Sequence, residues 1–211
     1  MEARLRASGA ELAPATDSLP ERPILTYEAD PAATAFSTVS KTYNHNFDAV
    51  ARVYMDRHKE PLPDPSQPEL ERITVEFERY FEKWNCVVQK RIYKLKNVAP
   101  YVIRRFAQQE HVYFVEEEVL DRKNKILYVR GQNRSFANYG TLRTFSTFQV
   151  DHDHPEKTIL SQGGEARLSN ALGMARGTIE RFLRTSFESG SEKSRELLEA
   201  RLADISTSSQ S

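Results

Sequence analysis

Cysteine is nearly missing from this 211-residue sequence, which contains only Cys86. A single cysteine excludes an intramolecular disulfide framework and any zinc site built from several thiolates, and it leaves the redox compartment open. Long apolar runs are missing as well, because none approaches the roughly 20 residues that span a bilayer. We therefore expect a protein that is soluble or only peripheral to membranes.

An excess of charge of either sign is also missing. Lysine and arginine together number 30, aspartate and glutamate together number 30, and the formal net charge is zero. The field of the whole molecule therefore gives no argument for a nucleic-acid partner, and any electrostatic function has to come from local patches of charge.

Catalytic and metal-binding motifs are absent too. The sequence has no P-loop, no G-x-G-x-x-G after a strand and no G-x-S-x-G elbow. The DHDH run at 151–154 precedes Pro155 and is more typical of a hairpin turn than of a metal site. Glu116 to Glu118 lack an evident partner base, which favours charges on a strand surface over paired catalytic carboxylates. We expect no enzymatic activity, no metal and no cofactor.

The N-terminal part of the chain differs in composition from the rest. It is rich in alanine, proline, serine and acids without sustained periodicity, which predicts a flexible segment outside the core. Arg4 and Arg6 are balanced by Glu2 and Glu11, whereas a transit peptide is rich in arginine and nearly free of acids. The expected organisation is a flexible extension over 1–36, one folded domain over 37–205 and a disordered tail over 206–211.

Periodicity predicts a helix, a series of strands and a second, longer helix. The first helix follows Asn46, which is suited to cap it, and places Phe47, Val50 and Tyr54 on one face. Turn signals separate strand-like segments near residues 72–81, 84–96, 111–119, 125–131, 133–150 and 156–168. Helical periodicity returns from 170 to 205, and Gly190 is expected to kink or break that helix. The order predicts an α+β fold in which an antiparallel sheet curves around a helix.

The stretch KNVAPYVIRRFAQQE, residues 96–110, is too apolar for an ordinary surface loop and too interrupted for a core helix. Its proline disfavours a helix through the preceding residue, which predicts a loop followed by a short amphipathic turn. Such an element suits a lid over an apolar cavity, although a crossover segment covering the sheet edge would have the same pattern. The residues expected to form the lid and contact a membrane are Val98, Pro100, Tyr101, Val102, Ile103, Arg104, Arg105 and Phe106.

Several cations lie close to these apolar elements. They are Arg57 at the end of the first helix, Lys94 and Lys96 before the predicted lid, and Lys193 and Arg195 on the last helix. If these elements meet at one rim of the sheet, the cations gather where an apolar cavity opens, as an anionic phospholipid requires. For each cation alone, solubility at the surface is the simpler explanation, and Arg57 also suits the dipole of its helix.

Five segments together resemble a known family. They are TYNHNFDAVARVYMDRHKEPLPDP, KRIYKLKNVAPYVIRRF, HVYFVEEEVLDRKNKILYVRGQNRSFANY, DHDHPEKTILSQGGEARL and TIERFLRTSFESGSEKSRELLEARL. In this order and spacing, over about residues 38–203, the chain resembles the PRELI-like domain family of mitochondrial phospholipid-transfer proteins.

The resemblance implies a curved antiparallel sheet of about seven strands, wrapped on the long C-terminal helix and enclosing a lipid tunnel with a lid loop. It implies a carrier that moves phosphatidic acid or phosphatidylserine between the mitochondrial outer and inner membranes, in the intermembrane space. The implied partners are the anionic phospholipid, a transiently contacted membrane surface and a small twin-CX9C helical protein. Some relatives carry this domain in larger cytosolic lipid-binding proteins, so a cytoplasmic location is the alternative.

The resemblance also assigns residues. Arg57, Lys94 or Lys96, Lys193 and Arg195 match basic positions of the family, which implies binding of the lipid head group. Leu142-Arg143-Thr144 stands where many members have an acidic pair, and Glu188 stands where phosphatidic acid carriers often have a lysine. The second departure weakens the expectation of phosphatidic acid and leaves phosphatidylserine open. The alternatives are an interaction module that kept the fold and lost its cavity, and an enzyme that uses the cavity as an active site.

Overall fold

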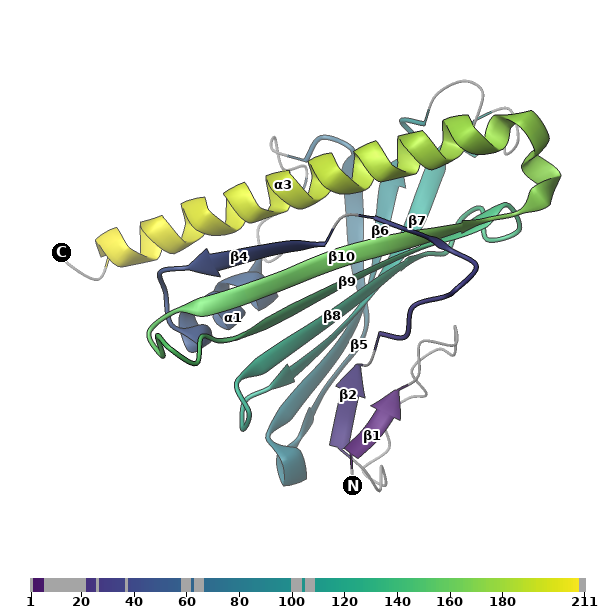
Figure 1. The fold of residues 1–211 in the computed structure, drawn as a ribbon. Coiled ribbons are helices and arrows are strands. Elements are labelled where there is room, and N and C mark those ends of the chain that lie inside the picture. The colour runs from purple at the N-terminus through teal and green to yellow at the C-terminus, as the bar shows by residue number, and fades with distance from the viewer. Residues whose placement is uncertain are drawn as a thin grey trace.

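The computed structural model describes residues 2–5, 22–25, 27–36, 38–57, 62, 67–99, 104 and 109–208. Figure 1 shows a curved antiparallel sheet with a long helix lying across one of its faces. The strands are β1 (Glu2–Leu5), β2 (Arg22–Leu25), β3 (Thr34–Ala35), β4 (Val39–Tyr43), β5 (Leu70–Phe81), β6 (Cys86–Lys96), β7 (His111–Asp121), β8 (Ile126–Asn133), β9 (Gly140–Val150) and β10 (Thr158–Leu168). The helices are α1 (Phe47–Asp56), α3 (Arg176–Ser208) and two short 3-10 helices, η1 (Glu82–Trp84) and η2 (Asn170–Ala175).

The sheet is a meander with a returning edge. Strands β5 to β10 pair in sequence order, and β10 also pairs with β3 and β4. β3 pairs with residues 165–166 of β10 and β4 with residues 158–162, so the two act as one interrupted edge strand. The expected α+β fold, with about seven strands and a long C-terminal helix, is confirmed.

One expected strand boundary is wrong. The segment expected to run from 133 to 150 contains a turn, because β8 ends at Asn133 and β9 begins at Gly140. The side-chain amide of Asn133 fixes this turn by donating to the carbonyl oxygens of Ser135 at 2.7 Å and Gly140 at 3.1 Å. Such local side-chain bonds compete with strand pairing and leave no trace in the periodicity of the sequence.

Helix α1 begins where the sequence predicts it. The Asn46 side chain accepts a hydrogen bond from the backbone N–H of Ala49 at 2.9 Å and so acts as the N-cap. The main core joins this helix to the sheet and to α3, and consists of Tyr43, Phe47, Val50, Ala51, Val53, Tyr54, Leu120, Leu127, Val129, Phe148, Leu160, Leu198 and Leu202. It sits where α1 meets the C-terminal half of α3 (Figure 1).

Helix α3 is continuous, so the expected kink or break at Gly190 is wrong. A glycine costs about 1 kcal/mol in a helix interior, and burial of Phe187 and Leu198 on either side of it offsets this cost. The helix runs to Ser208, into the segment predicted as a disordered tail, and residues 209–211 lie outside the described residues. Among the described helices, none has both the length and the apolar content needed to cross a membrane.

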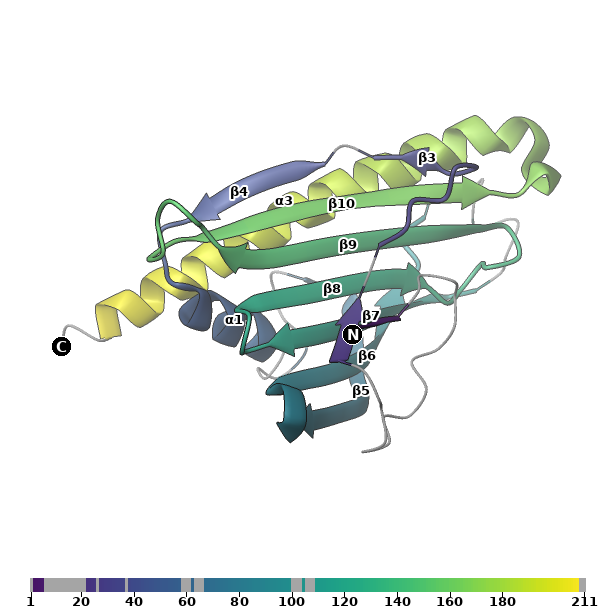
Figure 2. The same ribbon diagram turned by 60° about the horizontal axis from the view of Figure 1, so that its bottom comes forward.

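Part of the N-terminal segment lies on the face of the sheet opposite α3 (Figure 2). We call the face that carries α1 and α3 the inner face and the opposite one the outer face. Strands β1 and β2 pair in parallel, and Leu25 is buried against Phe81 and Val119 of the outer face. Phe36 is buried as well. The expectation that this segment stays outside the core is therefore wrong for Leu25, which covers apolar residues of the outer face, and for Phe36, which packs against Ala166 of β10 and Phe187 of α3.

Candidate functional site

Two cavities lie between the inner face and α3, and they share part of their walls. Their volumes are about 280 and 450 Å³. The residues that line both are Glu69, Leu95, Phe114, Leu142 and Ser186. Because these walls are common to both spaces, the two are adjacent, and we treat them as two compartments of one cavity.

The smaller space, which we call the apolar compartment, is lined mainly by hydrocarbon. Its other apolar walls are Ala99, Val112, Phe136, Tyr139, Leu168, Leu172, Ile179, Phe182 and Leu183. Lys96, Asn97 and Val98, at the end of β6, line it too, and the 72 % exposure of Val98 marks this end as the mouth. Removal of an apolar ligand from water into such walls is favourable.

The larger space, the polar compartment, is rich in hydroxyl, amide and charged groups. These are Tyr54, Arg57, Gln67, Tyr93, Glu116, Thr144, Ser146, Gln162, Ser191, Lys193, Ser194 and Arg201. Ser191, Lys193 and Ser194 come from α3, so a single helix borders both compartments. Val129, Phe187, Leu197 and Leu198 line the same compartment, so the cavity changes from almost wholly apolar to mixed along its length.

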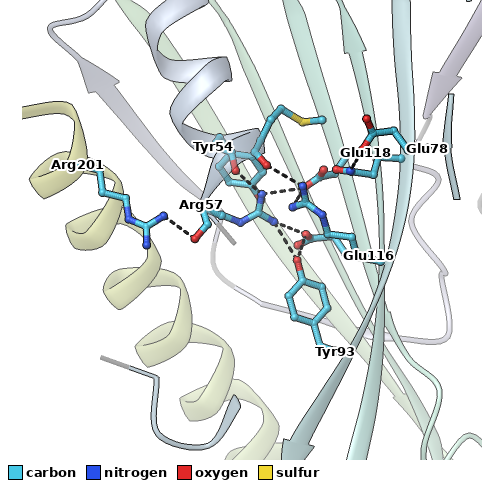
Figure 3. A network of polar contacts seen from close by, with 10 residues as sticks. Tyr54, Arg57, Glu78, Tyr93, Glu116, Glu118 and Arg201 are labelled. Carbon is cyan, nitrogen blue, oxygen red and sulfur yellow. Dashed lines mark hydrogen bonds and ion pairs between the residues drawn. The ribbon is translucent and has the colours of Figure 1, made fainter. Parts of the chain in front are cut away.

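A network of polar contacts, centred on Arg57, forms the end of the polar compartment next to α1 (Figure 3). Arg57 donates to Glu118 Oε1 at 2.8 Å, to the hydroxyl of Tyr93 at 3.2 Å, and to Glu116. The Tyr93 hydroxyl in turn donates to Glu116 at 2.6 Å. Arg201 of α3 donates to the backbone oxygen of Arg57 at 2.5 Å, which ties the long helix to the network.

Burial dominates the electrostatics of this network. Glu118 has no exposed side-chain surface, and its Oε2 atom has no hydrogen-bond partner among the described residues. Burial raises the pKa of Glu118 to about 7, Arg57 acts against this, and the neighbouring Glu116 adds to it. Burial opposes the charge on Arg57, but Glu116 leads the attractions that leave the Arg57 pKa above its ordinary value. Arg57 therefore stays charged, and Glu118 changes its protonation state near pH 7.

The three consecutive glutamates are not surface charges, which corrects the sequence interpretation. Glu116 and Glu118 point to the inner face and meet Arg57, whereas Glu117 pairs with Arg130 on the outer face. Alternation along the strand separates them. The signal in the sequence was the cationic pair Lys90-Arg91, which the register of β6 and β7 places opposite Glu117 and Glu116.

The predicted head-group cations are only partly brought together. Arg57 and Lys193 line the polar compartment, and Lys96 lines the apolar compartment near its mouth. Arg195 reaches the site indirectly, by donating to the Gln162 side chain at 2.9 Å. Lys94 neighbours the cavity-lining Leu95 in an extended strand and so lies on the outer face, where it pairs with Glu71 at 3.0 Å.

Most of the predicted lid falls outside the described residues. This is the case for Pro100, Tyr101, Val102, Ile103, Arg105 and Phe106. Val98 and Arg104 are described and both are exposed.

The DHDH run forms the turn that its pattern predicts. The Asp151 side chain accepts hydrogen bonds from the backbone N–H groups of Asp153 at 2.9 Å and His154 at 3.3 Å, between β9 and β10. Within the part of the chain that the structure describes, no group of three or more histidine, cysteine, aspartate or glutamate side chains is placed to hold a metal ion.

Comparison with known proteins identifies the family. The model of the PRELI-like family matches residues 48–208. The chain belongs to the PRELI-like family. This family is known in general for lipid transfer.

Relatives of this PRELI-like chain include the "Protein slowmo homolog" of Dictyostelium discoideum, 23% identical over 78% of this chain and 69% of that protein. The "CRAL-TRIO domain-containing protein T23G5.2" of Caenorhabditis elegans is 24% identical over 75% of this chain. "Protein real-time" of Drosophila melanogaster is 24% identical over 78% of this chain. The chain spans only 22% and 24% of the lengths of the last two relatives.

A solved structure shares the fold. The Zhui aromatase/cyclase from Streptomyces sp. R1128 superimposes with a TM-score of 0.54 at 12% sequence identity, covering 81% of this chain and 94% of that one. At this identity the likeness concerns the fold alone, a curved sheet wrapped on a long helix.

Proposed function

We propose that this chain is a phospholipid carrier that holds one lipid in the cavity between the inner face and α3. The observation that carries the proposal is the polarity gradient along that cavity. Acyl chains match the apolar walls of the smaller compartment, where each buried CH₂ contributes about 0.8 kcal/mol. The head group fits the polar compartment, whose hydroxyl, amide and cationic groups replace the hydrogen bonds that it makes with water.

The cations of the polar compartment favour an anionic head group. Arg57, Lys193 and Arg201 line it together with Glu69 and Glu116, a local excess of one positive charge. Arg57 is engaged by two carboxylates, whereas Lys193 has no ion-pair partner among the described residues. Lys193 and the adjacent serine hydroxyls are therefore suited to donate hydrogen bonds to a phosphate. Phosphatidic acid and phosphatidylserine both carry such a group, and Glu188, which is exposed and lines neither compartment, does not decide between them.

Membership of the PRELI-like family supports the cellular setting that we propose. The carrier shuttles its lipid between the mitochondrial outer and inner membranes and works in the intermembrane space with a small twin-CX9C helical partner. The residues of the predicted lid, around Arg104, contact the bilayer while the cavity opens. A second candidate is a lipid-binding domain of a larger cytosolic protein, favoured by relatives of which this chain spans less than a quarter.

The carrier acts without chemical conversion of its lipid. The charged groups next to the head-group position contact one another, Arg57 with Glu116 and Glu118, in an arrangement that neutralises charge. A hydrolase would instead need a nucleophile and a base aimed at the bound ester.

A lipid-transfer assay tests the proposal. Donor and acceptor liposomes are mixed with the purified chain, alone and with a twin-CX9C partner, and transfer of fluorescent phosphatidic acid, phosphatidylserine and phosphatidylcholine is compared. We expect faster transfer of an anionic lipid than of phosphatidylcholine, with each lipid recovered unchanged by mass spectrometry. Absence of transfer of every lipid by folded protein would favour an interaction module, and a shortened product would favour an enzyme.

A further inference from the structure

The turn between β10 and α3 presents an apolar side chain to solvent beside the mouth of the apolar compartment. Met174, in η2, is 102% exposed, the highest exposure among the large apolar side chains of the described residues. Val98, which lines the same compartment, follows at 72%. Figure 1 shows the start of α3 at the end of the sheet where β6 and β7 approach the helix. The most exposed apolar side chain thus lies two residues from Leu172, a wall of the compartment, and the second most exposed, Val98, lines that same compartment.

The backbone of the turn holds Met174 outward. Leu172 is buried in the wall of the apolar compartment, so it anchors the turn from inside. Gly173 then adopts φ +51° and ψ −130°, a conformation that is strongly unfavourable for residues other than glycine. Arg176 closes the turn by donating from its guanidinium to the Asn170 side chain at 3.2 Å. The exposure of Met174 is therefore built into a fixed turn.

The charge next to Met174 is positive. Arg176 and Arg181 lie in the first two turns of α3, and neither has a carboxylate partner within the described part of the chain. Glu180 is the acid between them, and it pairs with Arg184 at 3.7 Å. An exposed apolar tip followed by arginines that lack a carboxylate partner in the described part of the chain matches the interface of a bilayer that contains anionic lipids.

We propose that the η2 turn, residues 170–176, is a membrane-docking element that inserts Met174 into an anionic bilayer. Arg176 and Arg181 then contact head groups, and the mouth of the apolar compartment faces the membrane. The partner is a lipid bilayer surface. The inference rests on the proposed carrier function for its purpose, but insertion of the turn can be measured without lipid transfer.

The chain offers a clean labelling scheme for the test. Its single native cysteine, Cys86, is fully buried. A Met174→Cys variant therefore takes a polarity-sensitive fluorophore selectively at the turn. A Val75→Cys variant is the matched control, because Val75 is exposed on β5 and lines none of the cavities described above.

Labelled protein is mixed with vesicles of phosphatidylcholine and phosphatidylserine, and with vesicles of phosphatidylcholine alone. We expect a blue shift and quenching by spin-labelled acyl chains at position 174, with mixed vesicles only, and no change at position 75. Equal shifts at both positions, or no shift at position 174 with bound protein, would overturn the inference.

An unlabelled variant supplies the second measurement. Met174→Ser should weaken flotation with mixed vesicles about tenfold, as expected when one large apolar side chain no longer reaches hydrocarbon. Val75→Ser should leave flotation unchanged. If Met174 inserts while no lipid is transferred, the carrier function fails and the docking element stands. If transfer proceeds and flotation of Met174→Ser matches that of the parent chain, the docking element fails alone.

Discussion

The two faces of the sheet differ in how their buried carboxylates are neutralised. On the outer face, Glu117 pairs with Arg130, and Glu165 pairs with Arg143 beneath the N-terminal segment. On the inner face, Arg57 pairs with both Glu116 and Glu118 at the edge of a cavity, and Arg91 also pairs with Glu118. The outer-face carboxylates are neutralised in pairs, and the described part of the N-terminal segment covers part of that face, whereas the inner face keeps charged groups beside the cavity under α3. The function is therefore expected on the inner face.

Removal of Arg57 should have the largest effect on stability. Arg57→Ala leaves buried Glu116 without its cation and Glu118 with only Arg91, at 3.3 Å, and breaking a buried ion pair in this way costs about 3–5 kcal/mol of unfolding free energy. On the outer face, Arg130→Ala leaves only Glu117, and Lys90 lies opposite it in the neighbouring strand. We expect a smaller loss there. Urea unfolding of both variants checks the difference, and equal losses would contradict it.

Glu118 should make stability depend on pH. Its pKa of about 7 in the folded state exceeds the ordinary value of 4.5, so between these values the folded chain holds a proton that the unfolded chain has lost. The unfolding free energy should therefore fall as the pH rises from about 4.5 to 7, by up to about 3 kcal/mol, and level off above.

The matched variants are Glu118→Gln on the inner face and Glu117→Gln on the outer face. Denaturant midpoints measured across this pH range should lose their slope in the first variant and keep it in the second. A slope that survives Glu118→Gln would assign the titration to another group.

Filling the inner cavity should stop transfer while sparing the fold. Ser186 lines both compartments, so Ser186→Trp places a large side chain at their junction. We expect the transfer rate to fall by at least about tenfold with little change in thermal unfolding, because the ring occupies existing space. Ser189→Trp, one turn along α3 and outside both cavity walls, is the control. Normal transfer by Ser186→Trp would place the lipid elsewhere.

The two faces also separate the predicted head-group cations. Lys193 lines the polar compartment, and Lys94 pairs with Glu71 on the outer face. Lys193→Gln should slow transfer of an anionic lipid about fivefold, the effect of one charge-assisted hydrogen bond, and should leave phosphatidylcholine unaffected. Lys94→Gln should change neither rate. A loss on replacing Lys94 instead would point to an electrostatic role of the outer face.

The sequence predicts the fold and part of the site. The fold can be predicted for a different reason than the site. Strands, α1 and α3 follow from local periodicity, and the order of motifs gave the sheet around the helix. Pairing across the sheet is not local. Whether Glu118 faces a cavity or solvent depends on where α1 places Arg57. The residues next to Glu118 and Arg57 in the sequence do not predict this long-range contact. Gly190 was misjudged for the same reason, because tertiary packing of α3 outweighs an intrinsic preference.

Removing a contact of the N-terminal segment that covers the outer face should have the smallest effect on stability. The ring of Tyr27 lies 3.9 Å from that of Phe145, centroid to centroid, and the Tyr27 hydroxyl bonds to Glu165. Tyr27→Ala removes this aromatic contact, and we expect a loss of about 1 kcal/mol of unfolding free energy. Transfer should stay unchanged, because the contact is separated from the cavity by the sheet. If Tyr27→Ala slowed transfer as much as Ser186→Trp, the two faces would be coupled, and the N-terminal segment would control the cavity rather than cover the sheet.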